Sequence, residues 1–338
     1  MANKEPASQA AADDLTVSAN RTKAAASAVT KGKRYRASIY PETPIPAPFA
    51  KQILELEAML EIPIWLIVQN GARPWGEIGH ELFKGFQRAH PEMADGEPAA
   101  LLIESPGGDA HFAYRIARML QNRTGDQLTV IVPQYAKSAA TLLALGGASL
   151  IMGRDAELGP LDVQMFDIER ETVGSALDAY QALERLNAFA MTAVDQTMFL
   201  LMQRSGKRTD VILPQVLTYV ASFLRPLLEK IDTLDYTKKS RELKVAEEYA
   251  VRLMRPQYRA AEAKRVARQL VEKYPTHGFV IDSLEASSFE VEPDGETFGL
   301  GLNLCDLGDK EEEVENRLER LTPYLDELTV IGRVQERT

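Results

Sequence analysis

The chain has 338 residues and a hydrophobic content of 45%, which is enough for one sizeable core with appendages. Its 39 basic and 49 acidic residues give a formal net charge of −10, and an acidic chain repels phosphate backbones, which disfavours a nucleic-acid-binding role. The single cysteine, Cys305, excludes an intrachain disulfide, and without a secretory signal or an apolar run approaching the roughly 20 residues that cross a bilayer, the sequence predicts a soluble cytoplasmic protein with no membrane partner.

Residues 1–48 are predicted to form a disordered tail and a proline-rich linker. Up to about Tyr40, small, polar and charged residues follow one another without helical or strand period, and the prolines from Pro41 to Pro48 favour an extended, polyproline-like linker. The basic cluster Lys31–Arg36 is typical of a solvated segment and is also a candidate docking site for an ATPase or another partner. We expect folded structure to begin near Phe49.

Residues 49–172 alternate strand-like and helix-like segments. The spacing of apolar residues predicts helices over residues 50–60, 78–89, 110–120 and 138–145. Short apolar runs that end in turn residues predict strands over residues 63–68, 99–104, 128–132 and 149–152. Such alternation indicates βαβ crossovers, and therefore an α/β core with a largely parallel sheet, whose ligands gather at the carboxyl ends of the strands.

After Gln164 the pattern becomes helical. From Val173 to Met202, apolar residues recur every three or four positions, which predicts one long amphipathic helix with a wide apolar stripe. With further predicted helices it forms a helical arm, residues 173–255, whose stripe we expect to pack on the adjoining helices or on another subunit. Residues 256–308 are predicted to complete the core, and residues 309–338 to form a C-terminal helix.

Two strand-to-helix turns carry candidate chemistry. Gly107 and Gly108 follow a predicted strand, and because they lack Cβ atoms their backbone N–H groups can face an anion or a polarised carbonyl. Ser138 follows the next strand and is flanked by alanines, Ala139 among them, so little bulk hinders its hydroxyl. A nucleophile beside an oxyanion hole has this layout, with the backbone N–H groups of Gly107, Gly108 and Ala139 as the candidate donors. Taken singly, the same residues are more often a tight turn and a helix N-cap.

The order of three motifs resembles the Clp-fold serine peptidases: Ser-Pro-Gly-Gly at 105–108, the Ser138 turn, and Glu-Leu-Gly-Pro-Leu-Asp at 157–162. The resemblance is greatest to the serine dehydrogenase proteinase family, related to SppA and ClpP, and covers about Ala99 to Gln164 with parts of 274–302. It implies a Clp/crotonase-like βαβ superhelix whose inserted helical arm builds homo-oligomers. It also implies a serine endopeptidase acting on peptides or unfolded proteins, with neither metal nor cofactor.

A serine nucleophile needs a base within hydrogen-bond reach, and the chain has four histidines. His80 and His90 flank a helix far upstream and are interpreted as surface residues. His111 lies in the first turn of the helix after the two glycines and could reach the cleft, but is more often a polar residue of that turn.

His277 begins a run that resembles the closing signature of the family, at the position where Clp peptidases carry the acid of their triad. Asp162 follows Ser138 by 24 residues (162 − 138), close to where those enzymes carry the catalytic histidine. The resemblance therefore implies a triad of Ser138, His277 and Asp162 in which acid and base have exchanged positions.

Alternatives stay open. Asp162 is equally well explained as the cap of a turn. SppA-type enzymes use a lysine base, for which Lys137 and Lys207 are the candidates here. Two other functions compete with a peptidase: a structural subunit with an inactive Clp fold, and a crotonase-type acyl-CoA enzyme, which shares the glycine turn but needs no serine at Ser138.

Overall fold

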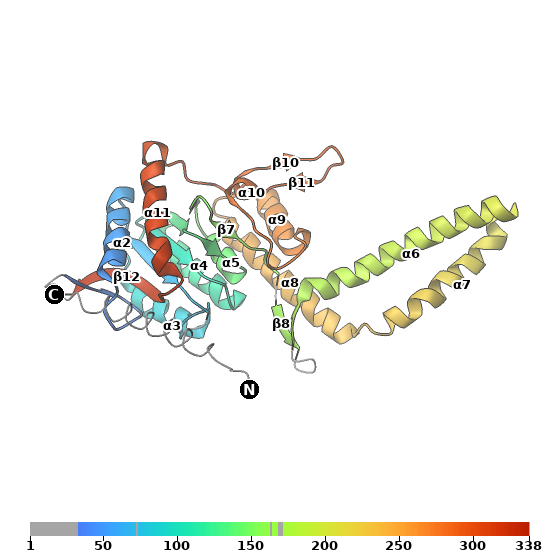
Figure 1. The fold of residues 1–338 in the computed structure, drawn as a ribbon, viewed down its shortest axis with the longest axis horizontal. Coiled ribbons are helices and arrows are strands. Elements are labelled where there is room, and N and C mark those ends of the chain that lie inside the picture. The colour runs from blue at the N-terminus through green and yellow to red at the C-terminus, as the bar shows by residue number, and fades with distance from the viewer. Residues whose placement is uncertain (1–32, 72–73, 163, 168–171, 338) are drawn as a thin grey trace, which may run out of the picture.

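The computed structural model describes residues 33–71, 74–162, 164–167 and 172–337. At its centre lies a six-stranded sheet in the order β1-β12-β2-β3-β4-β6 (Figure 1). The strands β2, β3, β4 and β6 run parallel to one another, and their bounds are Ile64–Val68, Ala99–Glu104, Leu128–Val132 and Ser149–Met152. The predicted α/β class with a parallel-rich sheet is confirmed.

Alternate residues of the parallel strands face two helical layers. Ile64, Leu66 and Val68 pack against α2 (Ala47–Leu60) and α11 (Glu311–Leu325). Trp65 and Ile67 face the other layer. That layer contains α3, α4, α5, α8 and α9, with bounds His80–Ala89, Ala110–Thr124, Ala139–Ala144, Thr233–Met254 and Ala260–Arg268. Because both faces are covered, every residue of β2 is buried, as the continuous apolar run predicted.

Three short strand pairs lie outside the central sheet. The chain forms the strand pairs β5–β7, β8–β9 and β10–β11, with bounds Tyr135–Ala136 and Glu157–Leu158, Gln164–Asp167 and Thr172–Ser175, and Glu290–Val291 and Thr297–Phe298. After α9 come a π-helical turn (Gln269–Lys273) and α10 (Ser283–Ser287). β10 and β11 pair antiparallel as a short hairpin.

Both ends of the described chain are strands, contrary to the predictions. β1 (Arg34–Ala37) lies within the predicted tail and pairs antiparallel with β12 (Val330–Arg337), so folded structure begins before Phe49. β12 in turn pairs antiparallel with β2, and the predicted C-terminal helix ends at Leu325. Residues 1–32 of the predicted tail lie outside the described residues.

The predicted long helix is α6 (Ala176–Ser205), which projects from the body together with α7 (Thr209–Leu228) as an antiparallel hairpin (Figure 1). The seam between the two helices is apolar. It consists of Ile212, Val216, Val220 and Leu224 on α7 against Leu186, Ala190, Ala193, Val194 and Met198 on α6. The stripe on α6 therefore packs on an adjoining helix of the arm, as expected.

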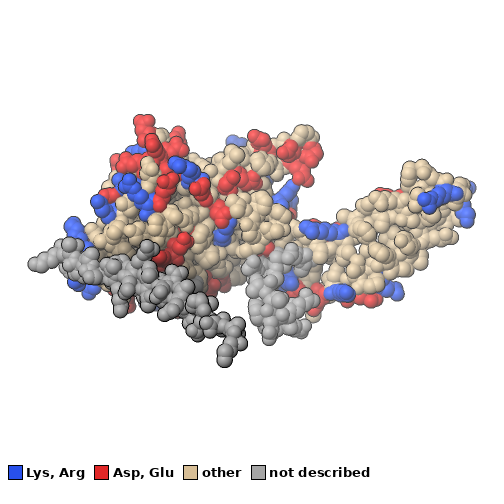
Figure 2. All heavy atoms as spheres, viewed as in Figure 1, with Lys and Arg blue, Asp and Glu red and all other residues tan. Residues whose placement is uncertain are grey.

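α7 is longer and more apolar than the sequence analysis allowed for. By length and composition alone this helix is apolar enough to cross a bilayer, and only 22% of its most apolar stretch is buried inside the protein. The expectation that no apolar run approaches this length is therefore wrong. Large apolar side chains, among them Phe189, Phe199 and Phe223, are exposed on the outer surfaces of the hairpin. Much of the hairpin face seen in Figure 2 carries neither acidic nor basic side chains.

Candidate active site

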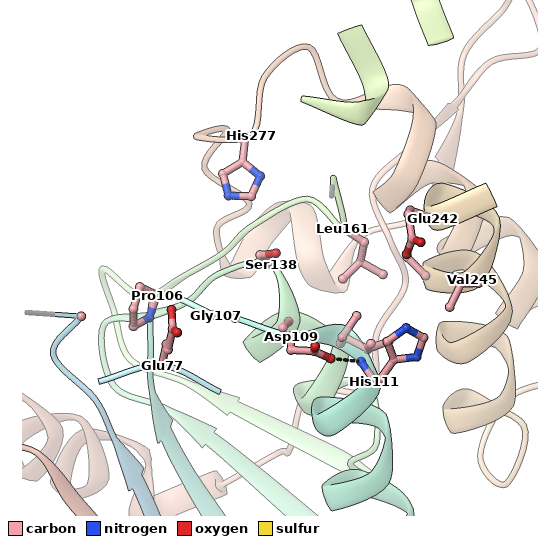
Figure 3. Close-up of a pocket in the computed structure, with 16 residues that line it drawn as sticks. Glu77, Pro106, Gly107, Asp109, His111, Ser138, Leu161, Glu242, Val245 and His277 are labelled. Carbon is pink, nitrogen blue, oxygen red and sulfur yellow. Dashed lines mark hydrogen bonds between the residues drawn. The ribbon is translucent and has the colours of Figure 1, made fainter. Parts of the chain in front are cut away.

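Ser138, His277 and the glycine turn line one pocket of about 530 Å³ (Figure 3). Ser138 follows β4 and β5, and the glycine turn follows β3, so the pocket lies at the carboxyl ends of parallel strands, as predicted. Ser138 lies between the His277 ring and the glycine turn in this view. Residues far apart in the sequence thus meet in one cavity.

Ser138 occupies the N-cap position of α5 without acting as a cap. Its side chain makes no capping hydrogen bond, and its backbone has φ 51° and ψ −116°, a left-handed conformation that costs an L-residue energy. The N-cap interpretation therefore does not explain this serine. A half-buried hydroxyl held on a strained turn in a pocket suits a nucleophile.

The glycine turn is fixed by Ile78. The Ile78 N–H donates to the Gly107 carbonyl at 2.7 Å, and the Asp109 N–H donates to the Ile78 carbonyl at 2.8 Å. Gly107 and Gly108 have φ 108° and 140°, and a Cβ on Gly108 would lie 2.3 Å from the Ile78 carbonyl oxygen. Glycine is therefore required here by the path of the turn and by Ile78.

The two glycines differ as candidate oxyanion donors. The Gly107 N–H donates to the Ser105 hydroxyl oxygen at 3.1 Å, which leaves it less available to hold an oxyanion than the sequence suggests. Within the described part of the chain, neither the Gly108 N–H nor the Ala139 N–H donates a hydrogen bond. Because both line the pocket beside Ser138, these two N–H groups remain available to hold an oxyanion.

A buried polar network that the sequence did not indicate supports the turn. The Ser105 hydroxyl donates to Gln69 Oε1 at 2.7 Å, and Gln69 Nε2 donates to the Trp75 carbonyl at 2.7 Å. The Ser105 backbone also bonds to two residues just before Ser138: its carbonyl accepts the Lys137 N–H, and its N–H donates to the Tyr135 carbonyl. Ser105 therefore fixes the positions of the glycine turn and the serine turn relative to each other.

His277 lies beside Asp162. Its Nδ1 is 3.1 Å from the backbone carbonyl oxygen of Asp162 and 4.0 Å from the carboxylate Oδ2. The carbonyl can only accept, so a proton on Nδ1 completes this bond and leaves the Nε2 lone pair of the neutral ring free. The buried Asp162 carboxylate also accepts the Leu177 N–H through Oδ1 at 3.3 Å. Asp162 thus combines a capping contact with proximity to the imidazole.

Thr141 joins the serine turn to the segment that carries Asp162. The buried Thr141 hydroxyl lies 2.6 Å from the Ala136 carbonyl oxygen and 2.8 Å from that of Gly159, and it accepts the Gly159 N–H at 3.0 Å. A threonine in an apolar helix gave no signal in the sequence, because its role depends on a segment 18 residues away.

The other candidate bases lie elsewhere or are engaged. Lys137 Nζ pairs with Glu157 at 2.8 Å and donates to the Leu158 carbonyl at 3.2 Å, away from the residues that line the pocket. Lys207 lies in the connection at the far end of the α6–α7 hairpin. His111 does line the pocket, but its Nδ1 is 2.8 Å from the Tyr249 hydroxyl. His80 and His90 line no part of it.

Glu104, the last residue of β3, is a buried carboxyl beside the site. Its Oε2 accepts the backbone N–H groups of Gln134 and Tyr135, whereas Oε1 has no hydrogen-bond partner among the described residues. Burial raises the pKa of Glu104 to about 8, although those two hydrogen bonds act in the opposite direction. Glu104 is therefore mostly protonated at neutral pH.

Comparison with known proteins is consistent with this site. Residues 81–202, which include the glycine turn, Ser138 and Asp162, match the family described as ClpP-like SDH-type serine proteinase. The chain is 26% identical over 239 residues to the uncharacterized protein MJ1495 of Methanocaldococcus jannaschii, covering 70% of this chain and 63% of that protein. A second uncharacterized protein of that organism, MJ0137, is 37% identical over 82 residues, 24% of this chain and 28% of its own length.

Proposed function

Since residues 81–202 assign the chain to the Clp-like serine peptidase family, we propose that it hydrolyses peptide bonds with Ser138 as the nucleophile. The observation that carries the proposal is the conformation of Ser138. This residue holds a strained, uncapped position in a pocket that it shares with His277 and with two backbone N–H groups that donate to no described residue. A serine whose role was to begin α5 would cap it, and the Ser138 side chain makes no capping hydrogen bond.

Acylation uses the groups around Ser138. His277 Nε2 takes the hydroxyl proton while Oγ forms a bond to the substrate carbonyl carbon. The Gly108 and Ala139 N–H groups hold the oxygen that gains the negative charge. The Asp162 carbonyl fixes the proton on Nδ1, and the Asp162 carboxylate stabilises the imidazolium. When the C–N bond breaks, His277 gives its proton to the leaving amine.

Deacylation repeats these steps with water as the nucleophile. His277 takes a proton from the water, whose oxygen attacks the acyl carbon, and the C–O bond to Ser138 then breaks as the proton returns to Oγ. The products are a carboxylic acid and the free enzyme. Every proton is carried by His277, so no metal or cofactor is required.

The wider assignments belong to the same proposal. The β2–β3–β4–β6 crossovers would be wound as a Clp/crotonase-like superhelix, and the α6–α7 hairpin would build a homo-oligomer in the cytoplasm. The substrates would be peptides or unfolded proteins. An ATPase or another partner would dock on the basic N-terminal segment. The matched regions span less than two thirds of the relatives' own lengths, so what those whole proteins do adds nothing to these assignments.

One observation disfavours the crotonase-type alternative. Among the described residues that line the pocket there is neither lysine nor arginine, whereas an acyl-CoA carries phosphate groups that cations would hold. An inactive structural subunit would share this fold but would neither react with a serine-directed reagent nor cleave peptides.

The test is covalent labelling of the whole protein with a fluorophosphonate. We expect stoichiometric modification of Ser138 in the native protein, none in Ser138→Ala, and undiminished modification in Ser287→Ala, which removes a hydroxyl on α10 outside the pocket. Labelling that persists in folded Ser138→Ala would refute the nucleophile. Failure to label or cleave in the native protein, under conditions where a control serine peptidase does both, would favour an inactive subunit.

A further inference from the structure

Among the described residues that line it, the pocket carries negative charge without a lysine or arginine to compensate it. The charged residues that line it are Glu77, Asp109 and Glu242, and the remaining titratable groups are His111 and His277. Asp109 is occupied as the N-cap of α4, because its carboxylate accepts the N–H groups of His111 and Phe112. Within the described residues, Glu77 and Glu242 have no ion pair or hydrogen bond to their carboxylates.

Glu242 stands on an apolar wall. It lies on α8, whose residues Val245 and Ala246 also line the pocket, together with Leu161 and Leu142. Figure 3 shows Glu242 next to Leu161 and Val245, on the side of the pocket opposite Glu77 and Pro106, with Ser138 between the two sides. A side chain that enters from Ser138 toward α8 would therefore meet methyl groups first and then a carboxylate.

Lysine and arginine side chains have the complementary order of groups, an apolar stem and then a cation. An uncharged apolar side chain would fill the same wall but leave the Glu242 carboxylate partly desolvated without a partner. An acidic side chain would be repelled by both glutamates. The net charge of −10 adds a long-range attraction for cationic peptides.

We propose that this pocket selects peptide substrates with a lysine or arginine next to the scissile bond, and that Glu242 on α8 binds its cation. The proposal rests on the peptidase function proposed above and adds a substrate class to it. Glu242 acts in selection, whereas Ser138 and His277 act on the bond.

The experiment compares peptides that differ only at this residue: lysine, norleucine, which keeps the apolar stem without the charge, and glutamate. The native protein should cleave the lysine peptide with a kcat/KM at least roughly tenfold above norleucine, as one partly desolvated charge pair provides. Glutamate should be the poorest substrate. Glu242→Gln should abolish the advantage of lysine, so that the lysine and norleucine peptides are cleaved with similar kcat/KM, and Glu242→Lys should favour glutamate.

A matched control lies on the same helix. Glu248→Gln removes a carboxylate that pairs with Arg252 at 3.0 Å and does not line the pocket, so the preference for lysine should persist. Cleavage of the norleucine and lysine peptides at equal rates, or an unchanged preference in folded Glu242→Gln, would overturn the proposal while leaving the peptidase intact.

A binding measurement separates this inference from the proposed function. By calorimetry, Ser138→Ala should bind the lysine peptide roughly tenfold tighter than the norleucine peptide, and the difference should shrink at high salt. If the native protein cleaves neither peptide but Ser138→Ala still prefers lysine, the peptidase assignment fails and the basic-side-chain site stands. Equal binding of both peptides overturns the site.

Discussion

At the scale of single residues, Ser138 shows what spacing reveals and what it conceals. A serine between small residues after a strand already indicated a nucleophile turn, because access to the hydroxyl depends on its immediate neighbours. The left-handed backbone and the missing capping bond are properties of the folded turn, and they separate a nucleophile from an N-cap. The local pattern located the residue, and the conformation decides between its interpretations.

The glycine turn illustrates the opposite case. Its two glycines were predicted to act together, yet the Gly107 N–H is used by Ser105 and only the Gly108 N–H is free among the described contacts. Sequence alone could not show this, since the partner hydroxyl is itself oriented by Gln69, 36 residues earlier. A Cβ on Gly108 would also meet the Ile78 backbone rather than substrate, so replacement of Gly108 tests folding as well as chemistry.

The identity of the base is tested by three alanine substitutions. His277→Ala should lower the rate of acylation by roughly 10²–10⁴, the usual contribution of a general base. Lys207→Ala should leave the rate unchanged, because Lys207 lies at the end of the hairpin away from the residues that line the pocket. The measurement is single-turnover acylation with a chromogenic ester.

Lys137→Ala is the informative control, since Lys137 adjoins Ser138 but pairs with Glu157. A modest loss through disturbance of the turn is compatible with His277 as the base. If acylation persists in folded His277→Ala and disappears in Lys137→Ala, the chain uses serine–lysine chemistry and the roles of His277 and Asp162 are wrong.

Glu104 should make the stability of the protein depend on pH. Its folded pKa of about 8 lies above the ordinary value of 4.5, so between these values the folded protein holds a proton that the unfolded chain releases. Its contribution to stability is therefore complete below about pH 4.5 and is lost as the pH rises to about 8, with a slope of at most about 1.4 kcal/mol per pH unit.

Glu104→Gln cannot ionise and keeps an oxygen for the Gln134 and Tyr135 N–H groups. Urea unfolding across this range should show the native protein losing stability relative to Glu104→Gln as the pH rises. Parallel pH profiles for the two proteins would mean that Glu104 is ionised in the fold.

At the scale of elements, the accuracy of the predictions followed the strength of the local pattern. The helices and strands of 49–152 were predicted because each buries a periodic or continuous set of apolar residues. β1 has the sequence Arg-Tyr-Arg-Ala, whose basic character is typical of disordered tails. It forms a strand through its pairing with the distant β12. β12 was predicted as the continuation of the C-terminal helix, although two helix-breaking residues mark the change: Pro323 lies near the end of α11 and Gly332 lies within β12.

The α6–α7 hairpin leaves apolar surface that needs a partner. Phe189 and Phe223 lie on adjacent helices with ring centroids 6.1 Å apart, and their exposures are 50% and 56%. If this surface joins subunits, Phe189→Glu with Phe223→Glu should reduce the particle mass measured by light scattering. Leu186 and Met198 are unsuitable targets, because they pack in the seam and a charge there would open the hairpin itself.

Gln196→Glu adds a charge at an exposed polar position of α6 and should leave the mass unchanged. An unchanged mass in the double variant would contradict assembly through this surface. Flotation of the native protein with lipid vesicles, lost in the double variant, would then identify a bilayer as the occupant, in agreement with the length and composition of α7.

At the scale of the whole molecule, the parallel strands and the two ends of the chain depend on each other. β2 would be the edge of the parallel sheet, but β12 covers it, and β1 covers β12 in turn. The two strands come from opposite ends of the described chain, so their pairing has the largest sequence separation in the sheet. The local spacing of apolar residues does not indicate contacts between distant segments. The parallel core was therefore predicted, whereas the pairing of β12 and β1 at its edge was not.

Truncation tests whether β1 is an integral part of the fold. A chain without residues 1–32 keeps every described contact of β1 and serves as the control. A chain without residues 1–38 loses β1 and two hydrogen bonds between Ser38 and Arg333. In one, the Ser38 N–H donates to the Arg333 carbonyl at 2.9 Å, and in the other the Arg333 N–H donates to the Ser38 hydroxyl oxygen at 2.8 Å. It would also leave residues 334–337 of β12 as an unprotected edge, which favours aggregation, whereas Ile39 and Tyr40 would still pair with Ile331. If the chain without residues 1–38 loses about 1 kcal/mol of unfolding free energy, its Tm should fall by roughly 2–4 °C relative to the control. Equal Tm values and equal solubility for the two truncated chains would show that β12 needs no cover and that the core is complete without the N-terminal strand.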